Sequence, residues 1–396
     1  MAKTYLVSAL GARMREAGST TEVKTKNEQE SQEFMERKLM SNLRVAVIGC
    51  GYWGQNLLRN FCELDEADVV KVCDADGPAL ARTKRRYPSI EVTRTYTEVL
   101  ADPRVDAVVI ATPVSTHYSL AKQALRSGKH VLVEKPLAQS TAQVLDLIEL
   151  SEQVGKILMV DHTFLYTGAV RRMKKLVETG DIGQLLYFDS VRISLGLVQS
   201  DINVLWDLGP HDLSIMDYLF EREPVAISAT GVKHLNTPYE NIAYVTVHFP
   251  MNLIAHLHLN WLAPVKVRRT LVGGSKKMIV YDDMENSEKV KVFDKGVVQN
   301  HDPERRQRLL TAYRNGDVLV PQLDTTEALR LMARDFVSSI AEQRAPLSDG
   351  YSGYRVVRLL EAAQRSLEEN GRTILLENSP LAGRTLQAGP GVMAAD

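Results

Sequence analysis

The sequence is poor in the features that mark disulfide-stabilised, membrane-spanning and nucleic-acid-binding proteins. Its 396 residues include three cysteines, Cys50, Cys62 and Cys73, which lack metal-site spacing and are expected to be reduced thiols. No run approaches the roughly 18 consecutive apolar residues of a transmembrane helix. The 48 basic and 49 acidic side chains give a net charge of −1, without general attraction to nucleic acid or anionic lipid. We therefore expect a cytoplasmic protein that binds neither nucleic acid nor membrane.

The chain is long enough for two domains, and its two ends differ from the rest in composition. Residues 1–40 contain a polar, charged stretch without an apolar face, so we expect a disordered extension, and they lack an adequate signal-peptide core. Residues 379–396 are rich in Gly and Ala and are expected to form a loose tail. Between them we place one domain at 41–161 and a second at 162–378.

Residues 43–74 have the pattern of a dinucleotide-binding unit. The β-branched run Leu43–Ile48 predicts a strand, and it leads through Gly49, Gly51 and Gly54 into a helical segment. In this motif the first glycine allows the tight turn, the second lets backbone approach a pyrophosphate, and the third permits close packing of helix on strand. The helix N-terminus offers free N–H groups to the phosphates. Tyr52 and Trp53 lie between the last two glycines and are expected to contact the cofactor.

An acidic residue at the end of the second strand indicates which cofactor binds. Asp74 follows Gly54 by about 20 residues, where a carboxylate accepts hydrogen bonds from the adenosine ribose hydroxyls and repels a 2′-phosphate. This favours NAD over NADP. The preference stays open to challenge because four nearby basic side chains could reach a phosphate: Arg82, Lys84, Arg85 and Arg86.

Alternating strands and helices continue to about Asp161 and predict a Rossmann domain with a parallel sheet. Strands are expected at 107–111, 130–133 and 157–160, each short and apolar. In such sheets ligands bind beyond the carboxyl ends of the strands. The residues expected on that rim, and hence in cofactor contact, are Thr112, Pro113, His117, Glu134 and Lys135.

The pattern changes after Asp161. A helix is expected at 169–179, followed by runs of strand character between residues 185 and 293, several of which alternate apolar and polar side chains. Two late helices are expected at 326–342 and 353–369. The fold class is therefore an N-terminal Rossmann domain followed by an α+β domain with a large, mostly antiparallel open sheet.

Two segments carry the residues best suited to acid–base chemistry. Lys135 stands on the rim, where it could hydrogen-bond a substrate hydroxyl, and a cis bond to Pro136 would be one way to aim it inward. Gly209-Pro210 looks like a helix start, which would put His211 in the first turn, where the helix dipole disfavours its charged form. Asp207 could orient that imidazole or bind a hydroxyl. These residues are the candidate catalytic and substrate-binding groups.

Further candidates for substrate binding are His162 and Tyr166, which follow the last Rossmann strand, and Asn203. His256 and His258 alternate in a strand and fit a sheet surface better than a metal site. Asp282 and Asp283 have no companions at metal-ligand spacing, and we expect no metal.

Taken together, these segments resemble the glucose–fructose oxidoreductase/inositol dehydrogenase (Gfo/Idh/MocA) family over about residues 43–377. The resemblance rests on the glycine motif, on Thr112-Pro113 with His117, on Glu134-Lys135-Pro136, and on Asp207 with His211. It implies that Lys135 and His211 act on the hydroxyl being oxidised, with Asp207 in support. It also implies homodimers or homotetramers built through the open sheet of the second domain.

Within the family, residues 200–214 and 261–268 are similar to predicted dehydrogenases of surface-polysaccharide pathways. The resemblance implies NAD-dependent oxidation of the 3-hydroxyl of a UDP-N-acetyl sugar or its uronic acid. Two alternatives remain: an NADPH-dependent ketoreductase acting on a deoxysugar nucleotide, and a non-catalytic sensor that binds NAD(H). A free sugar or inositol also stays open as substrate.

Overall fold

The computed structural model describes residues 42–196, 201–234, 236–298 and 312–377. The extension predicted at 1–40 and the tail predicted at 379–396 lie outside the described residues.

The first half of the chain forms a six-stranded sheet with parallel pairing throughout, in the order β3-β2-β1-β4-β5-β6. Its strands are β1 (Leu43–Ile48), β2 (Ala67–Cys73), β3 (Glu91–Thr93), β4 (Ala107–Ile110), β5 (His130–Glu134) and β6 (Leu158–Asp161). The intervening helices are α2 (Tyr52–Cys62), α3 (Gly77–Arg86), α4 (Tyr96–Ala101), α5 (Val114–Arg126) and α6 (Thr141–Gln153). The central strands β1 and β4 are almost wholly buried, as expected of a parallel sheet covered by helices on both faces.

The second half forms a nine-stranded sheet in the order β16-β13-β12-β11-β7-β10-β9-β8-β17. Its strands are β7 (Leu185–Ile193), β8 (Ala226–Val232), β9 (Ile242–His248), β10 (Ile254–Asn260), β11 (Val267–Gly274), β12 (Met278–Asp282), β13 (Val290–Phe293), β16 (Val318–Leu319) and β17 (Ile374–Leu375). Only β7 and β10 pair in parallel among these strands; every other neighbouring pair is antiparallel. The predicted fold class, a Rossmann domain followed by a mostly antiparallel sheet, is confirmed.

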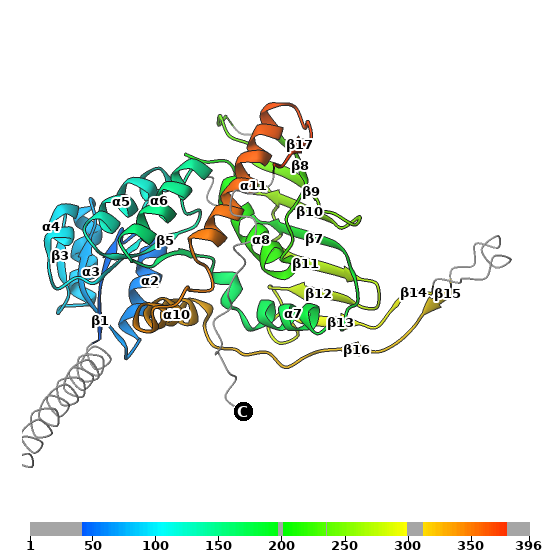
Figure 1. Cartoon of the computed structure of the whole chain (residues 1–396), viewed down its shortest axis with the longest axis horizontal. Coiled ribbons are helices and arrows are strands. Elements are labelled where there is room, and N and C mark those ends of the chain that lie inside the picture. Colours follow the sequence, from blue (N-terminus) through cyan, green and yellow to red (C-terminus); the bar gives the residue numbers. More distant parts are fainter. Residues whose placement is uncertain (1–41, 197–200, 235, 299–311, 378–396) are drawn as a thin grey trace, which may run out of the picture.

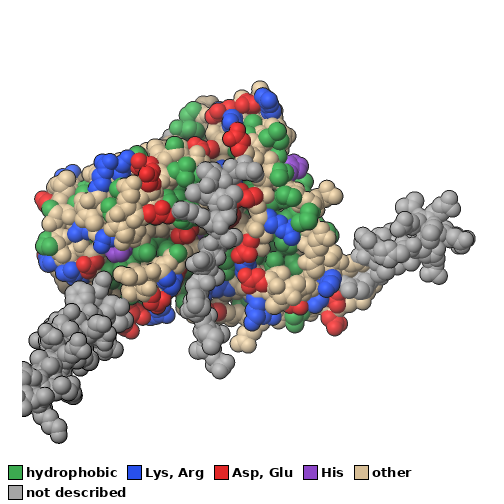
Figure 2. All heavy atoms as spheres, viewed as in Figure 1, with side chains coloured by type: hydrophobic (Ala, Val, Ile, Leu, Met, Phe, Trp, Pro, Cys, Tyr) green, Lys and Arg blue, Asp and Glu red, His purple; other side chains and the backbone are tan. Residues whose placement is uncertain are grey.

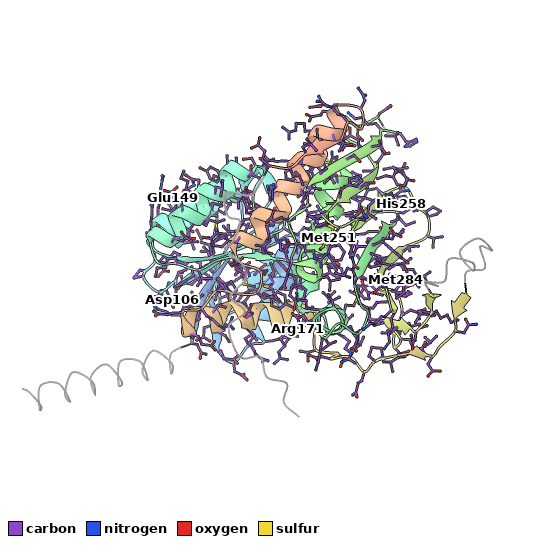
Figure 3. All side chains as sticks on the ribbon, turned by 45° about the vertical axis from the view of Figure 1, so that its right-hand side comes forward. Asp106, Glu149, Arg171, Met251, His258 and Met284 are labelled. Atoms are coloured by element: carbon purple, nitrogen blue, oxygen red, sulfur yellow. The ribbon has the colours of Figure 1, made fainter. Side chains whose placement is uncertain are left out.

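One face of the larger sheet is covered by helices. They are α7 (Gly168–Glu178), α8 (Val204–Phe220) and α11 (Gly350–Glu368), which lie together on that face in Figure 1. The other face carries Tyr244 stacked on His256 and His258, with ring centroids 6.2 and 4.5 Å apart. His258 marks this face in Figure 3, and we call it the uncovered face because no helix of the described ranges lies on it. The alternation of buried and partly exposed residues along β10 follows directly from this one-sided cover.

The last two helices return to the Rossmann sheet. Tyr354 and Val357 of α11 belong to the apolar cluster of the Rossmann strands, and the helix crosses between the two sheets in Figure 1. Phe336 of α10 (Ala328–Glu342) packs edge to face on Phe61 of α2, with ring centroids 6.3 Å apart. A short helix, η1 (Thr163–Tyr166), links the two halves directly after β6. The two sheets are thus held together by chain segments that are distant in sequence.

The short strands β14 (Gly296–Val298) and β15 (Ala312–Arg314) pair outside both sheets and stand away from the body in Figure 1. Basic and acidic side chains are mixed over the face shown in Figure 2. None of the helices in the described ranges is long and apolar enough to cross a membrane.

Candidate functional site

The glycine-rich loop has the geometry that a dinucleotide needs. Gly49 has φ of +87°, and a Cβ there would lie 2.5 Å from the Ala111 carbonyl oxygen. A Cβ on Gly54 would lie 2.0 Å from the Gly49 oxygen, so helix α2 touches the loop backbone. A Cβ on Gly51 meets no atom within 4 Å, and Gly51 caps α2 without a side-chain hydrogen bond to the helix. The loop is therefore tight on its inner side and open where free helix N–H groups point outward.

Asp74 lies beside this loop at the end of β2. Its carboxylate accepts hydrogen bonds from the backbone N–H of Cys50 (2.5 Å) and of Asp76 (2.7 Å). Burial acts to raise the pKa of Asp74, but these hydrogen bonds outweigh it and hold the pKa below its ordinary value. The carboxylate stays ionised at neutral pH, with lone pairs left for ribose hydroxyls.

Two exposed aromatic rings stand beside the open side of the loop. Tyr52 and Trp53, 78% and 47% exposed, meet edge to face with centroids 5.3 Å apart at the start of α2. Of the basic side chains that could challenge the preference for NAD, Arg82 lies 3.9 Å from Asp76, and Lys84 donates to the Ile90 carbonyl. Arg94, which sequence reasoning did not single out, donates to the Ala75 carbonyl next to Asp74.

His117 joins two segments of the rim. Its buried ring places Nδ1 2.8 Å from the Pro136 oxygen and Nε2 2.8 Å from the Thr112 oxygen. Burial lowers the pKa of His117, so one nitrogen of the neutral ring donates and the other faces a carbonyl oxygen. The ring thereby holds the Thr112-Pro113 turn against the Lys135–Pro136 turn, whose peptide bond is cis. A direct contact of His117 with the cofactor stays a prediction.

Lys135 and Asp207 form an ion pair where the two halves of the chain meet. The Lys135 ammonium donates to Asp207 Oδ1 (3.1 Å) and to the Asp207 carbonyl oxygen (2.7 Å). The side chains are 11% and 18% exposed. Trp261 Nε1 donates to Asp207 Oδ2 at 3.1 Å, so both carboxylate oxygens are held. An ammonium has three N–H donors, and this arrangement leaves one of them for a ligand.

His211 lies near this pair, but for a different reason from the one the sequence suggested. The predicted helix start at Gly209-Pro210 is wrong: α8 begins at Val204, is capped by Asn203, and contains Pro210 in its interior. His211 is therefore two turns into the helix, away from the N-terminal dipole.

The charge state of His211 follows from its surroundings. Burial, and then the charges of Lys135, Arg192 and Arg268, set the pKa of His211 well below its ordinary value. Its ring packs edge to face on Phe164, 5.1 Å between centroids. Among the described residues no group hydrogen-bonds either ring nitrogen. The imidazole is thus neutral, without a hydrogen-bond partner among the described residues, and within electrostatic range of the Lys135 ammonium.

Two buried carboxyl groups lie behind Lys135. Glu134 and Asp161 are paired residues at the carboxyl ends of β5 and β6. Burial, reinforced by Asp161, raises the pKa of Glu134 well above its usual range, and burial raises the pKa of Asp161 to about 6. Glu134 Oε2 accepts the Lys135 backbone N–H at 3.2 Å, and Asp161 accepts the Thr163 hydroxyl. Two carboxylates side by side in low dielectric do not both ionise, so the pair keeps one proton at neutral pH.

The remaining predicted substrate contacts lie mostly inside the protein. Neither buried ring nitrogen of His162 has a partner among the described residues, and burial lowers the pKa of His162 to about 3. Tyr166 is fully buried and gives its hydroxyl to Asp335 (2.8 Å), with Ser348 also in range. Asn203 caps α8 and also bonds Glu240 and Gln364, so all its polar groups are engaged. These positions favour structural roles for Tyr166 and Asn203.

Sequence reasoning missed four residues around the site formed by Lys135, Asp207 and His211. Trp261 and Arg192 reach it only through the packing of segments distant in sequence, and no local pattern marks them. Asp161 ends an apolar strand and Phe164 lies between His162 and Tyr166, so the strand-end pattern and the segment after it could have indicated both. Within the described ranges, no group of three or more His, Cys, Asp or Glu side chains is arranged to hold a metal ion.

Known proteins share both the sequence pattern and this architecture. The family model described as "Oxidoreductase family, NAD-binding Rossmann fold" matches residues 43–162, and the GFO/IDH/MocA C-terminal domain matches residues 170–280. UDP-N-acetylglucosamine 3-dehydrogenase from Acidithiobacillus ferrooxidans is 26% identical over 322 residues, which cover 80% of this chain and 95% of that protein. The scyllo-inositol 2-dehydrogenase (NADP(+)) of Bacillus subtilis is 22% identical, covering 86% of this chain and 98% of its own.

Solved structures agree in fold. The structure of the A. ferrooxidans enzyme has a TM-score of 0.71 at 23% identity, covering 83% of this chain and 99% of its own. GenD2 from gentamicin A biosynthesis, in complex with NAD, has a TM-score of 0.73 at 23% identity, covering 86% of this chain and 97% of its own. With the glycine loop, the Lys135–Asp207 pair and both domain matches in place, the chain belongs to the Gfo/Idh/MocA family of NAD(P)-binding oxidoreductases.

Proposed function

We propose that the protein is an NAD-dependent dehydrogenase that oxidises a sugar hydroxyl, namely the 3-hydroxyl of a UDP-N-acetyl sugar or its uronic acid. The observation that carries the proposal is the Lys135 ammonium, held by Asp207 next to the free imidazole of His211. The substrate assignment draws on the similarity to UDP-N-acetylglucosamine 3-dehydrogenase along 80% of this chain.

The side chains divide the proton chemistry between them. The remaining N–H of Lys135 donates to the substrate hydroxyl oxygen and stabilises the negative charge that develops there. His211, neutral before reaction, accepts the hydroxyl proton. Asp207 fixes the ammonium through two contacts and is itself fixed by Trp261. A bound nicotinamide supplies the hydride acceptor.

The cofactor sits along the rim in this proposal. Gly49, Gly51 and Gly54 take the pyrophosphate, and Asp74 takes the adenosine ribose. The ionised Asp74 carboxylate favours NAD because it repels a 2′-phosphate. The B. subtilis relative is an NADP(+) enzyme by name, so cofactor choice varies among proteins of this similarity. Separate calorimetric titrations with NAD and NADP decide the preference here.

The catalytic assignment is tested by turnover. Purified wild type is assayed with NAD and a panel of UDP-sugars, together with Lys135→Met and His211→Gln. Removing acid–base help is expected to lower kcat/KM by about a hundredfold or more in each variant. Lys122→Met is the matched control, because Lys122 also pairs with an aspartate, Asp146, but on the outer helices α5 and α6. Near-normal turnover in both site variants would exclude the mechanism.

The same assay separates the rival functions. Turnover of a keto-deoxysugar nucleotide with NADPH, and no turnover with NAD, would indicate a ketoreductase. Tight NAD binding without turnover of any sugar would indicate a sensor.

We also propose that two or four copies associate through the uncovered face of the larger sheet. Tyr244 and Ile254 on this face are 43% and 40% exposed. Light scattering after size exclusion gives the mass, and Tyr244→Glu is expected to shift it to the monomer.

A further inference from the structure

Two arginines face each other on the helix-covered side of the larger sheet. Arg268 on β11 is the register partner of Arg192 on β7 in an antiparallel pair. Their neighbours in the same register, Thr270 opposite Ser190 and Val272 opposite Phe188, are buried, which fixes the face that this row occupies. Like charges directly opposite each other destabilise a sheet. A negative charge placed near both arginines would therefore stabilise this cross-strand pair.

Both guanidinium groups lie against the ring that supports His211. The Arg192 guanidinium is 4.5 Å and the Arg268 guanidinium 6.0 Å from the centroid of the Phe164 ring. The same ring contacts the His211 imidazole. The two arginines are thus grouped near the His211 imidazole, on which their charges and that of Lys135 act together.

The nearby carboxylates do not accept hydrogen bonds from all the N–H donors of these two guanidinium groups. Asp212 binds Arg192 through Nε and Nη2, which leaves Nη1 buried without a partner among the described residues. Asp283 is shared between Arg268 (3.2 Å) and Lys289 (3.1 Å), so two cations compete for one carboxylate. The Arg268 guanidinium makes no other hydrogen bond within the described ranges, and the side chain is 36% exposed. An accessible guanidinium with spare donors therefore remains beside the Phe164 ring that contacts His211.

We propose that Arg268, backed by the buried Arg192, binds an anionic oxygen group of the substrate, and that the enzyme selects sugars carrying such a group. The guanidinium fork matches a carboxylate or a phosphate, and the surplus positive charge favours a charged ligand over a neutral sugar. The anion is either the carboxylate of a sugar uronic acid or the diphosphate of the nucleotide. The inference rests on the proposed oxidation of sugar nucleotides at the site formed by Lys135, Asp207 and His211.

Arg269 supplies a matched control for the test. It follows Arg268 on β11 but projects from the other face of the strand and binds Asp282. Arg268→Gln and Arg269→Gln are compared with wild type for kcat and KM on UDP-N-acetylglucosamine, on its 6-carboxylate form, and on free N-acetylglucosamine. Binding of both nucleotides is also measured by calorimetry with NAD present.

Arg268→Gln is expected to raise KM at least tenfold for the charged substrates while changing kcat little. The KM for free N-acetylglucosamine should stay the same. An effect confined to the uronic acid identifies the carboxylate as the anion, and an equal effect on both nucleotides identifies the diphosphate. The inference is overturned if Arg268→Gln has the same kinetic constants as Arg269→Gln. It is also overturned if Arg268→Gln raises the KM for free N-acetylglucosamine as much as the KM for the sugar nucleotides. If wild type oxidises none of these sugars yet binds a nucleotide through Arg268, the proposed function fails while the anion site stands.

Discussion

Replacing Gly51 with alanine tests the cofactor loop without disturbing the fold. A Cβ at this position meets no protein atom within 4 Å. The substitution at the helix cap is therefore expected to cost at most about 1 kcal/mol of unfolding free energy. The added methyl group fills the space through which the pyrophosphate approaches the backbone. The dissociation constant for NAD should rise at least about tenfold, which corresponds to roughly 1.4 kcal/mol.

Alanine substitutions at two other glycines serve as controls for Gly51→Ala, because they are expected to change stability and NAD affinity differently. A Cβ at Gly54 would stand 2.0 Å from the Gly49 oxygen, so Gly54→Ala must displace backbone and should lower stability by about 1–3 kcal/mol. Gly155 has φ of +62° at the end of α6, so Gly155→Ala should cost about 1–2 kcal/mol while leaving NAD affinity unchanged. Urea unfolding and calorimetry measure both quantities. Wild-type NAD affinity in a folded Gly51→Ala protein would refute the assignment of the loop.

Three further predictions concern titratable groups near Lys135. Asp207→Asn takes the carboxylate from Lys135, so kcat/KM in steady-state assays should fall about a hundredfold, whereas an unchanged value would contradict the role of the pair. Glu134→Gln mimics the protonated acid, so activity at pH 7 should persist, and carboxyl-carbon NMR should show the pKa of Asp161 still near 6, because burial raises it; a pKa of Asp161 that falls to the ordinary range would show that a charge on Glu134, and not burial, raises it. Because the pKa of buried His162 is about 3, the unfolded chain takes up a proton below pH 6.5 that the folded chain does not, and stability falls as pH falls. This contribution is about 1.4 kcal/mol per pH unit between pH 6.5 and 4. Urea midpoints of wild type and His162→Gln should therefore converge on acidification, and parallel curves would argue against a neutral His162.

Local sequence signals were sufficient for the cofactor loop and for the rim. The roles of Gly49, Gly51 and Gly54 follow from backbone sterics that a short motif encodes, and Asp74 and Lys135 each stand at the end of an apolar strand. Residues of this kind are placed by their immediate neighbours in the chain. Their positions were therefore predictable without knowledge of the tertiary structure.

The environment of His211 was not predictable in the same way. Pro210 is typical of a first helical turn, yet the cap at Asn203 starts α8 earlier and the helix continues through the proline. Trp261 and Arg192 come from strands whose register with each other and with α8 is set by the whole sheet. The low pKa of His211 therefore comes from tertiary burial and cations, and the helix start proposed from sequence does not contribute to it.

The most direct test of the central claim is turnover of UDP-N-acetyl sugars by wild type and by Lys135→Met, followed through the absorbance of the reduced cofactor. NAD-dependent oxidation by wild type, lost in the variant while NAD affinity stays within a few fold, is the predicted result. Turnover that survives loss of the lysine ammonium, or reduction of NADP in preference to NAD, would contradict the account.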